Sequence, residues 1–290
     1  MSESGALTLA SLAQMLQTHP WNTRPARLNF EVKPQTEWLI SVGYGRKGAD
    51  LSPARDHQSY PEIPQASMRG LLRDAVESLA SWYPVALGLL CGAGTGAADF
   101  CGTGSSDKAC LACRTFGSPL RRGGWYVSAA GLSDLQRALY QQLDPPPHPR
   151  DSWDAPTRLA LRESLFQRRM RVAMNAELGR ADEHKLFDFE TAVSDLRLHG
   201  FAEERPPLMP DVQTRAADIV ALAVSLSLIE RVGSHRRKGW GQVHVQSVVL
   251  TCDAEQAPNL PLTGPVLSSL AGELLDRPAA AVGARSEARP

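Results

Sequence analysis

The sequence has no excess of either charge and no apolar run long enough to cross a membrane. Lys plus Arg and Asp plus Glu each total 31 of the 290 residues, so the chain lacks the global positive charge that would by itself indicate a nucleic-acid partner. No stretch approaches the ~18–20 apolar residues of a transmembrane helix, and the N-terminus lacks the pattern of a secretory signal. We therefore expect a cytoplasmic protein with no membrane contact, in which any polyanion binds to local patches.

Cysteine is also scarce, and its distribution is uneven. Of five cysteines, Cys91, Cys101, Cys110 and Cys113 fall in one polar, glycine-rich segment. Disulfides do not persist in a reducing compartment, so metal binding is the leading use of this cluster. Four thiolates match the closed tetrahedral ligand set of structural zinc, with unliganded thiols as the alternative. Cys252, alone at a strand end, is expected to be a small buried hydrophobe.

The composition, 43% hydrophobic and 21% charged, is that of a globular protein. We expect an N-terminal extension with a short helix at 1–26, a main domain at 27–254, and a short helix followed by a disordered tail at 255–290. The main domain carries a large insertion at about 84–213, which includes the cysteine cluster. A proline-rich linker, DPPPHPRD, lies inside this insertion at 144–151.

Hydrophobic periodicity predicts strands and helices in a mixed order. Alternation predicts two strands in 27–42, the second from Trp38 to Val42, and another strand over 241–250. Helical spacing predicts one helix capped by Ser67 and a second over 215–233. A helical stretch to about Gln167 and a strand over 170–175 are expected in the insertion. The order of the outer elements is that of an α+β, ferredoxin-like (RNA-recognition-motif-like) domain.

Two glycine-rich loops carry cations. GSHRRKGWGQV (233–243) holds Arg236, Arg237 and Lys238 between glycines, and GYGRKGAD (43–50) holds Arg46 and Lys47. Glycines let backbone amides approach a ligand closely, and the cations favour an anionic ligand such as phosphate. A solvated turn is the alternative in each case.

Asp50 ends the first of these loops. A carboxylate beside two cations stays ionised, and it could hold a divalent cation or orient a 2′-hydroxyl if a nucleic-acid backbone crossed the loop. The alternative is an Asp that only forms a turn. His57, seven residues further on, could shuttle a proton or be merely polar.

Other arginines gather near aromatic or glycine residues. Arg69 and Arg73 lie four residues apart on one side of the predicted helix, where both could reach one extended polyanion or simply face solvent. RTFGSPLRRGG (114–124) and FQRRMRV (166–172) are two further basic segments of this kind.

Four segments in order carry a resemblance to a known family: GADLSPARDHQSYPEIPQASMRGLLRDAVESL (48–79), CLACRTFGSP (110–119), RVAMNAELGRADEHKLFDFETAV (171–193) and GSHRRKGWGQV (233–243). Together they resemble the RAMP superfamily, and most closely the backbone subunits of type III CRISPR effector complexes. The sequence departs from the family pattern at IPQASMRG and in the His-Arg-Arg-Lys of the last loop. The resemblance implies a thumb hairpin in the insertion.

The resemblance also implies a function. Such a subunit binds guide RNA, stacks with other RAMP-fold subunits of the complex, and presents Asp50 to paired target RNA, which it would cleave with Mg²⁺. The residues expected to contact RNA are Arg46, Lys47, Arg69, Arg73, Arg169, Arg171, Arg236, Arg237 and Lys238.

Three alternatives stay open at this point. The chain could be an inert guide-RNA scaffold, with Asp50 taking no part in cleavage. It could be a guide-processing endoribonuclease of the same superfamily that uses His57 as acid or base. It could also be a zinc-stabilised interaction module with no RNA role.

Overall fold

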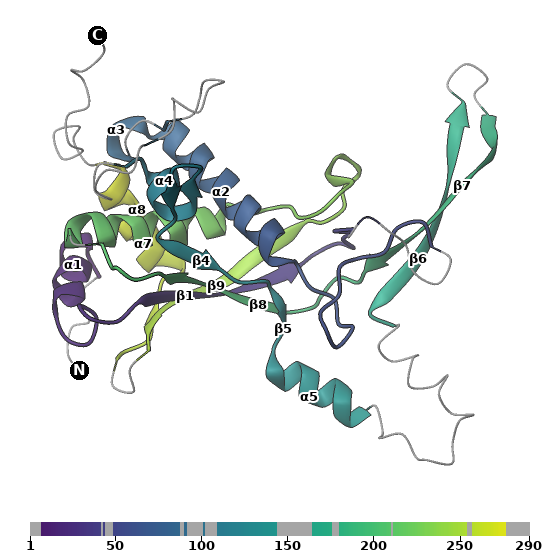
Figure 1. Ribbon diagram of the computed structural model, residues 1–290. Coiled ribbons are helices and arrows are strands. Elements are labelled where there is room, and N and C mark those ends of the chain that lie inside the picture. Colours follow the sequence, from purple (N-terminus) through teal and green to yellow (C-terminus); the bar gives the residue numbers. More distant parts are fainter. Residues whose placement is uncertain are drawn as a thin grey trace, which may run out of the picture.

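A computed structural model describes residues 7–41, 43, 49–87, 90–91, 101, 109–143, 164–175, 180–209, 211–253 and 257–276 (Figure 1). The helices are α1 (Leu9–Gln17), α2 (Gln65–Trp82), α3 (Pro84–Leu87), α4 (Leu111–Phe116), α5 (Asp134–Leu143), α7 (Val212–Ser227), α8 (Gly264–Leu275) and a 3-10 turn, η3 (Arg236–Lys238). The strands are β1 (Ala26–Pro34), β2 (Gly117–Ser118), β3 (Arg121–Arg122), β4 (Trp125–Val127), β5 (Gly131–Leu132), β6 (Phe166–Asn175), β7 (Arg180–Ala192), β8 (Leu198–Glu204), β9 (Val243–Cys252) and β10 (Leu260–Pro261). None of the described helices is long and apolar enough to cross a membrane.

The main sheet has the strand order β10-β9-β1-β8-β4, and β5 also pairs with β8. Every neighbouring pair in it is antiparallel. Along the chain, β1, α2, β4, β8, α7 and β9 follow one another as β-α-β-β-α-β, which is the ferredoxin-like arrangement. The predicted α+β class is therefore confirmed, and the insertions lie before β4 and between β4 and β8.

One face of this sheet is covered by α2, α7 and α8 (Figure 1). Alternate residues of β1, namely Leu28, Phe30 and Val32, are buried against these helices. The N-terminal segment joins the same core, because Leu12 and Trp21 are also buried. Residues 7–26 thus contribute packing to the domain that follows them.

Several local predictions differ from the structure. The strand expected from Trp38 to Val42 is replaced by isolated bridges at Trp38 and Ser41, which pair with two different segments, while Val42 lies outside the described residues. α2 begins at Gln65 with Pro64 as its N-cap and no side-chain cap hydrogen bond, so Ser67 does not cap it. Proline has a fixed φ suited to a helix start, which lets the helix begin earlier.

The insertion differs as well. Gln167 lies in β6 rather than in a helix, because the segment pairs with β7 from Phe166 onward. β8, which the periodicity did not predict, occupies a central place in the main sheet. The whole linker at 144–151, and the expected tail after residue 276, lie outside the described residues.

A long two-stranded ribbon, β6 with β7, projects beyond the end of the main sheet (Figure 1). We call it the thumb ribbon. Four large apolar side chains midway along it are exposed: Met170, Val172, Leu186 and Phe187. The ribbon is therefore an arm with little protein around its middle.

Candidate nucleic-acid interface

Asp50 lies on the base of the thumb ribbon. Its carboxylate Oδ2 accepts a hydrogen bond from the N–H of Asp188 on β7 (2.8 Å), and its own N–H donates to the Asp188 carbonyl (2.5 Å). Pairing continues one residue on, where Leu51 bridges Phe189 and accepts a hydrogen bond from the Glu190 N–H (2.9 Å). Asp50 remains exposed. The backbone thus holds this carboxylate in place and leaves it accessible to a ligand.

The segment before the Asp50 loop, at Glu37 and Trp38, also contacts the thumb ribbon. Trp38 and Ala192 exchange two backbone hydrogen bonds of 3.1 and 2.8 Å. Glu37, next to Trp38, forms an ion pair with Arg169 of β6 and accepts a hydrogen bond from the Thr191 hydroxyl (3.0 Å). The hydrogen bond from Arg169 holds the pKa of Glu37 below its ordinary value, against the opposing effect of burial.

Asp188 adds a second carboxylate beside Asp50. Its Oδ2 accepts a hydrogen bond from Arg168 (2.5 Å) across the ribbon. Its Oδ1 is buried and makes no hydrogen bond within the described part of the chain. Two acidic side chains therefore stand on neighbouring backbones at the foot of the ribbon.

An aromatic cluster joins the thumb ribbon to the loop at 233–241. Trp240 lies 5.3 Å from both Phe189 and His235, measured between ring centroids. The Arg171 guanidinium lies 4.6 Å from the centre of Trp240 and 5.4 Å from that of Phe189, within cation–π range. Burial, and then the charges of Arg171 and Lys238, lower the pKa of His235, which favours its neutral form.

The backbone of this loop requires its glycines. A Cβ on Gly241, which has φ +68°, would lie 1.9 Å from the Val232 carbonyl oxygen. Gly239 ends the η3 turn at φ +82°, a conformation that few other residues adopt. The turn presents Arg236, Arg237 and Lys238, all of them exposed.

Two of the expected RNA contacts are arginines of α2. Arg69 donates a hydrogen bond to the carbonyl of Phe116, the last residue of α4. Arg73 pairs with Glu77 one turn further along the same helix (2.7 Å). Both arginines therefore have a protein partner, but the side chains of the second pair are 37% and 41% exposed.

The four clustered cysteines come together at α4. Their Sγ atoms all lie within 4.8 Å of one another, with Cys91 3.4 Å from Cys110 and 3.1 Å from Cys113. A zinc ion with bonds of about 2.3 Å to four sulfurs at tetrahedral corners would separate them by about 3.8 Å, so the cluster has the right size. Burial raises the pKa of both Cys91 and Cys113, which disfavours bare thiolates. The set could hold a metal ion such as zinc. Cys252 is buried apart from it, as predicted.

A sequence profile of the RAMP superfamily matches residues 31–244. The chain belongs to the RAMP superfamily. The matched region begins within β1 and ends within β9, and so includes Asp50, the cysteine cluster, the thumb ribbon and the glycine loop. No curated protein sequence matches the chain.

This RAMP chain gathers some of the candidate RNA-contacting residues at one place. Asp50 pairs with β7, Arg169 and Arg171 stand on β6, and the glycine loop reaches the thumb ribbon through Trp240, which lies under Arg171. Arg69 and Arg73 lie on α2, where Arg69 reaches the end of α4, and the cysteine cluster adjoins α4, which lies away from the ribbon (Figure 1). Arg46 and Lys47 lie outside the described residues.

Sequence reasoning missed three residues of this RAMP site: Asp188, Phe189 and Trp240. The segment FDFE places an Asp between two aromatic residues on a strand, and Trp240 interrupts a glycine-rich basic loop. Both are visible signals of an aromatic surface near acidic and basic groups. Only the fold shows that they meet.

The second Asp of the family segment, Asp56, has a structural role. Its Oδ1 accepts hydrogen bonds from the N–H groups of Gln58 and Tyr60 (2.8 and 2.9 Å), and its other oxygen pairs with Arg137 (2.9 Å). These contacts fix the turn that follows the Asp50 segment and tie it to α5. His57, in the same turn, is exposed.

Proposed function

We propose that this chain is a guide-RNA-binding backbone subunit of a type III CRISPR effector complex, and that it cleaves complementary target RNA with Asp50. Guide RNA, target RNA and other RAMP-fold subunits are its partners in this proposal. Membership of the RAMP superfamily supports an RNA-binding role in such a complex.

The observation that carries the cleavage proposal is the pairing of Asp50 with the base of the thumb ribbon. The ribbon is the element that would displace a nucleotide from the guide–target duplex. Because Asp188 N–H holds the Asp50 carboxylate, the displaced nucleotide and the carboxylate belong to one site. The His235 and Trp240 rings of the glycine loop pack against the buried Phe189 of β7, next to Asp188, and, being half-buried, can stack against an unpaired base.

The chemistry fits attack by the 2′-hydroxyl of the target RNA. Asp50 accepts a hydrogen bond from that hydroxyl and orients its oxygen toward the adjacent phosphorus. The 2′-hydroxyl proton passes to the Asp50 carboxylate as the 2′-oxygen forms a bond to phosphorus. The bond to the 5′-oxygen of the next nucleotide breaks, that oxygen takes a proton from water, and Asp50 returns its proton to water. The products are a 2′,3′-cyclic phosphate and a 5′-hydroxyl. DNA lacks the 2′-hydroxyl and is expected to resist cleavage.

Two metals belong to this proposal. Mg²⁺ binds through one or two carboxylates plus phosphate oxygens, and Asp50 supplies an exposed carboxylate of that kind. When bound there, it would stabilise the charge that develops on the phosphate. Zinc at Cys91, Cys101, Cys110 and Cys113 is structural, since four sulfur ligands leave no open position for chemistry.

The test compares target-RNA cleavage by the complex, purified with its guide RNA, with Asp50 intact and as Asp50→Ala, with and without Mg²⁺. We expect cleavage to fall by at least about 100-fold while target binding is retained, a loss typical of removing one essential catalytic group. A target with a single 2′-deoxy nucleotide at the cut should also resist. Asp195→Asn is the matched control, because Asp195 is an exposed loop carboxylate that has φ +64°, which Asn tolerates.

Each other outcome identifies an alternative. Cutting by Asp50→Ala at the wild-type rate would make the chain a scaffold that holds the guide. Metal-independent cleavage of precursor RNA by the isolated chain, lost in His57→Ala, would make it a guide-processing enzyme. Purified material without any RNA would contradict all three RNA readings.

A further inference from the structure

A groove on the far flank of α2 is lined by five arginines. Arg69 and Arg73 line it from α2, Arg121 and Arg122 from the short β2–β3 ribbon, and Arg205 from the end of β8. Among the residues that the structure describes, no Asp or Glu lines this groove. In a chain with equal numbers of acidic and basic residues, such a set is a strong local concentration of positive charge.

The β2–β3 ribbon that carries two of these arginines is rigid. Its register pairs Gly117 with Arg122 and Ser118 with Arg121. Gly117 has φ +86°, and a Cβ there would lie 2.6 Å from the Gly123 nitrogen. A Cβ on Gly123 would in turn lie 2.4 Å from the Phe116 carbonyl carbon. The two glycines let the ribbon fold directly against α4, which fixes where its arginines stand.

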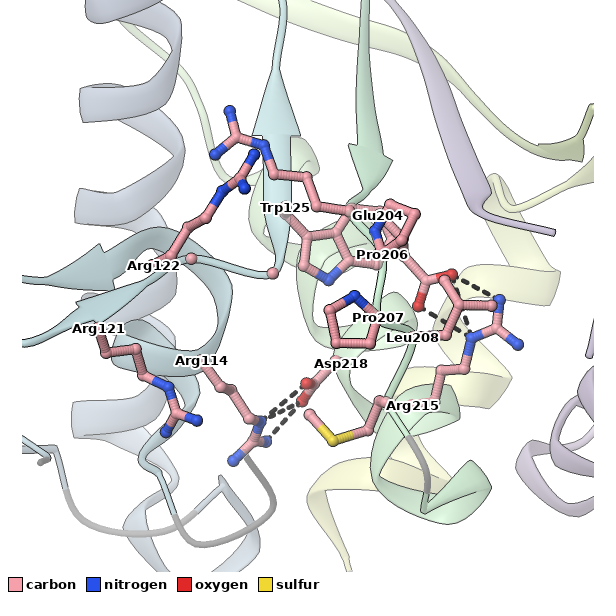
Figure 2. Close-up of a pocket in the computed structure, with 14 residues that line it drawn as sticks. Arg114, Arg121, Arg122, Trp125, Glu204, Pro206, Pro207, Leu208, Arg215 and Asp218 are labelled. Carbon is pink, nitrogen blue, oxygen red and sulfur yellow. Dashed lines mark hydrogen bonds and ion pairs between the residues drawn. The ribbon is translucent and has the colours of Figure 1, made fainter. Parts of the chain in front are cut away.

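Nearby carboxylates are already neutralised by other arginines. Beside the groove is a pocket of about 170 Å³ that shares Arg121, Arg122 and Arg205 with it and contains the acidic residues Glu204 and Asp218. Figure 2 shows each of these in an ion pair, Glu204 with Arg215 and Asp218 with Arg114, while Arg122 extends away from both pairs. The buried acids therefore do not compensate the arginines of the groove.

We propose that this groove binds the phosphates of a single RNA strand, with Arg122 and Arg205 as contacts beyond those expected on α2 and the glycine loop. The inference rests on the proposed RNA-binding function and extends its interface to the β2–β3 ribbon. Guanidinium groups bind phosphate oxygens with paired, charge-assisted hydrogen bonds, so arginine is the residue suited to this ligand.

The surface of α2 joins this groove to the glycine loop. A second groove follows the other flank of the same helix, lined among others by Ser67, Gly70, Arg236 and one acidic residue, Asp74. Gly70 is exposed, and a Cβ added there would meet nothing within 4 Å. An RNA strand could cross α2 at Gly70 and pass from Arg236 to Arg69 and then to Arg122. This continuity favours an extended RNA over an acidic protein segment, which would need only one of the grooves.

The test measures binding of a labelled single-stranded RNA of mixed sequence to the full chain across a series of salt concentrations. For Arg122→Gln with Arg205→Gln, we expect at least about 10-fold weaker binding at low salt. The slope of log K against log salt should fall by about 0.7 for each lost phosphate contact. Arg197→Gln is the matched control, because Arg197 is 62% exposed and lies outside both grooves. Unchanged melting temperatures would show that the variants fold.

The outcomes separate this inference from the proposed function. No RNA binding by the wild-type chain would overturn both. Wild-type binding with an unchanged affinity and salt slope in the double variant would overturn the groove alone. Loss of binding to poly-glutamate, with RNA binding retained, would instead assign the groove to an acidic protein partner and overturn the RNA assignment.

Discussion

At the scale of single residues, the proposed RNA contacts combine arginines that already have partners on this chain with others that remain available. Arg169 pairs with Glu37 and Arg73 with Glu77, and in both pairs the arginine is more than a third exposed. Exposed ion pairs contribute little to stability, so such an arginine can exchange its carboxylate for a phosphate at low cost.

Gly70 matters for a different reason. Because it has no side chain, a ligand can approach the α2 backbone closely where the two grooves meet.

Replacing Gly70 should raise the stability of the domain and weaken its RNA binding. Glycine in a helix interior is less favourable than glutamine, so Gly70→Gln is expected to raise the free energy of unfolding by about 0.5 kcal/mol. The added side chain should also obstruct the RNA path and weaken RNA binding several-fold. Denaturant unfolding and RNA titration measure the two effects.

Gly272 of α8 provides a matched control, because a Cβ there also meets nothing within 4 Å. Gly272→Gln should give a similar gain in stability and leave RNA affinity unchanged. A Gly70→Gln chain that binds RNA as well as the wild type would mean that no strand crosses α2 at this point.

At the scale of elements, strong periodicity made β1, α2, α7 and β9 predictable, whereas β8 was not. The inward positions of β8 include Gly200 and Glu204 instead of large apolar residues. Gly200 lies against the Phe30 ring, where a Cβ would be 2.7 Å from ring atoms, and Glu204 pairs with Arg215. Because residues of other elements fill the space at the core face of β8, the β8 sequence does not itself alternate between apolar and polar residues.

The candidate site, too, could be predicted from the sequence only in part. The Asp50 loop and the glycine loop stand out by composition alone. The residue that holds Asp50 is 138 positions away, and it does so through its backbone N–H, which carries no residue-specific signal. Contacts of this kind follow from the fold, so no local pattern could have predicted Asp188.

The cysteine cluster and α4 form one structural unit, and metal removal tests whether its stability depends on zinc. α4 begins immediately after Cys110 and contains Cys113, while Arg114 ties the helix to the buried Asp218 of α7. We expect about one zinc per chain, and a chelator should lower the melting temperature by at least about 4 °C, which corresponds to about 2 kcal/mol in a chain of this size. Cys110→Ser should abolish metal binding, whereas Cys252→Ser should retain it. Less than about half an equivalent of zinc in the wild type would contradict a four-cysteine site.

At the scale of the whole molecule, one buried ion pair joins segments from distant parts of the chain. Arg215 of α7 pairs with Glu204 of β8 and donates to the Trp21 and Arg24 carbonyls, while the Glu204 carboxylate accepts from the Ala26 N–H. The N-terminal segment, the sheet and α7 therefore meet at a single charged pair with almost no exposure.

Breaking this pair should destabilise the whole domain. Glu204→Gln leaves the Arg215 charge buried without a counter-ion, and we expect a loss of about 3 kcal/mol or more in the free energy of unfolding. The neighbouring Glu203 pairs with Arg27 at the surface, with side chains 31% and 42% exposed, so Glu203→Gln should cost less than about 1 kcal/mol. Equal losses in denaturant unfolding of the two variants would refute the role assigned to the buried pair.

The hydrogen bond from the Leu9 N–H to the Glu273 carboxylate places the beginning of α1 beside α8 (2.7 Å). Because α1 and α8 touch, the domain suits a circular permutation in which a linker joins these two helices and the chain is opened elsewhere. Because the sheet is assembled from strands far apart in sequence, a permuted chain would retain the same pairings. New chain ends, and any label or fusion partner attached to them, could then be moved away from α1 and α8.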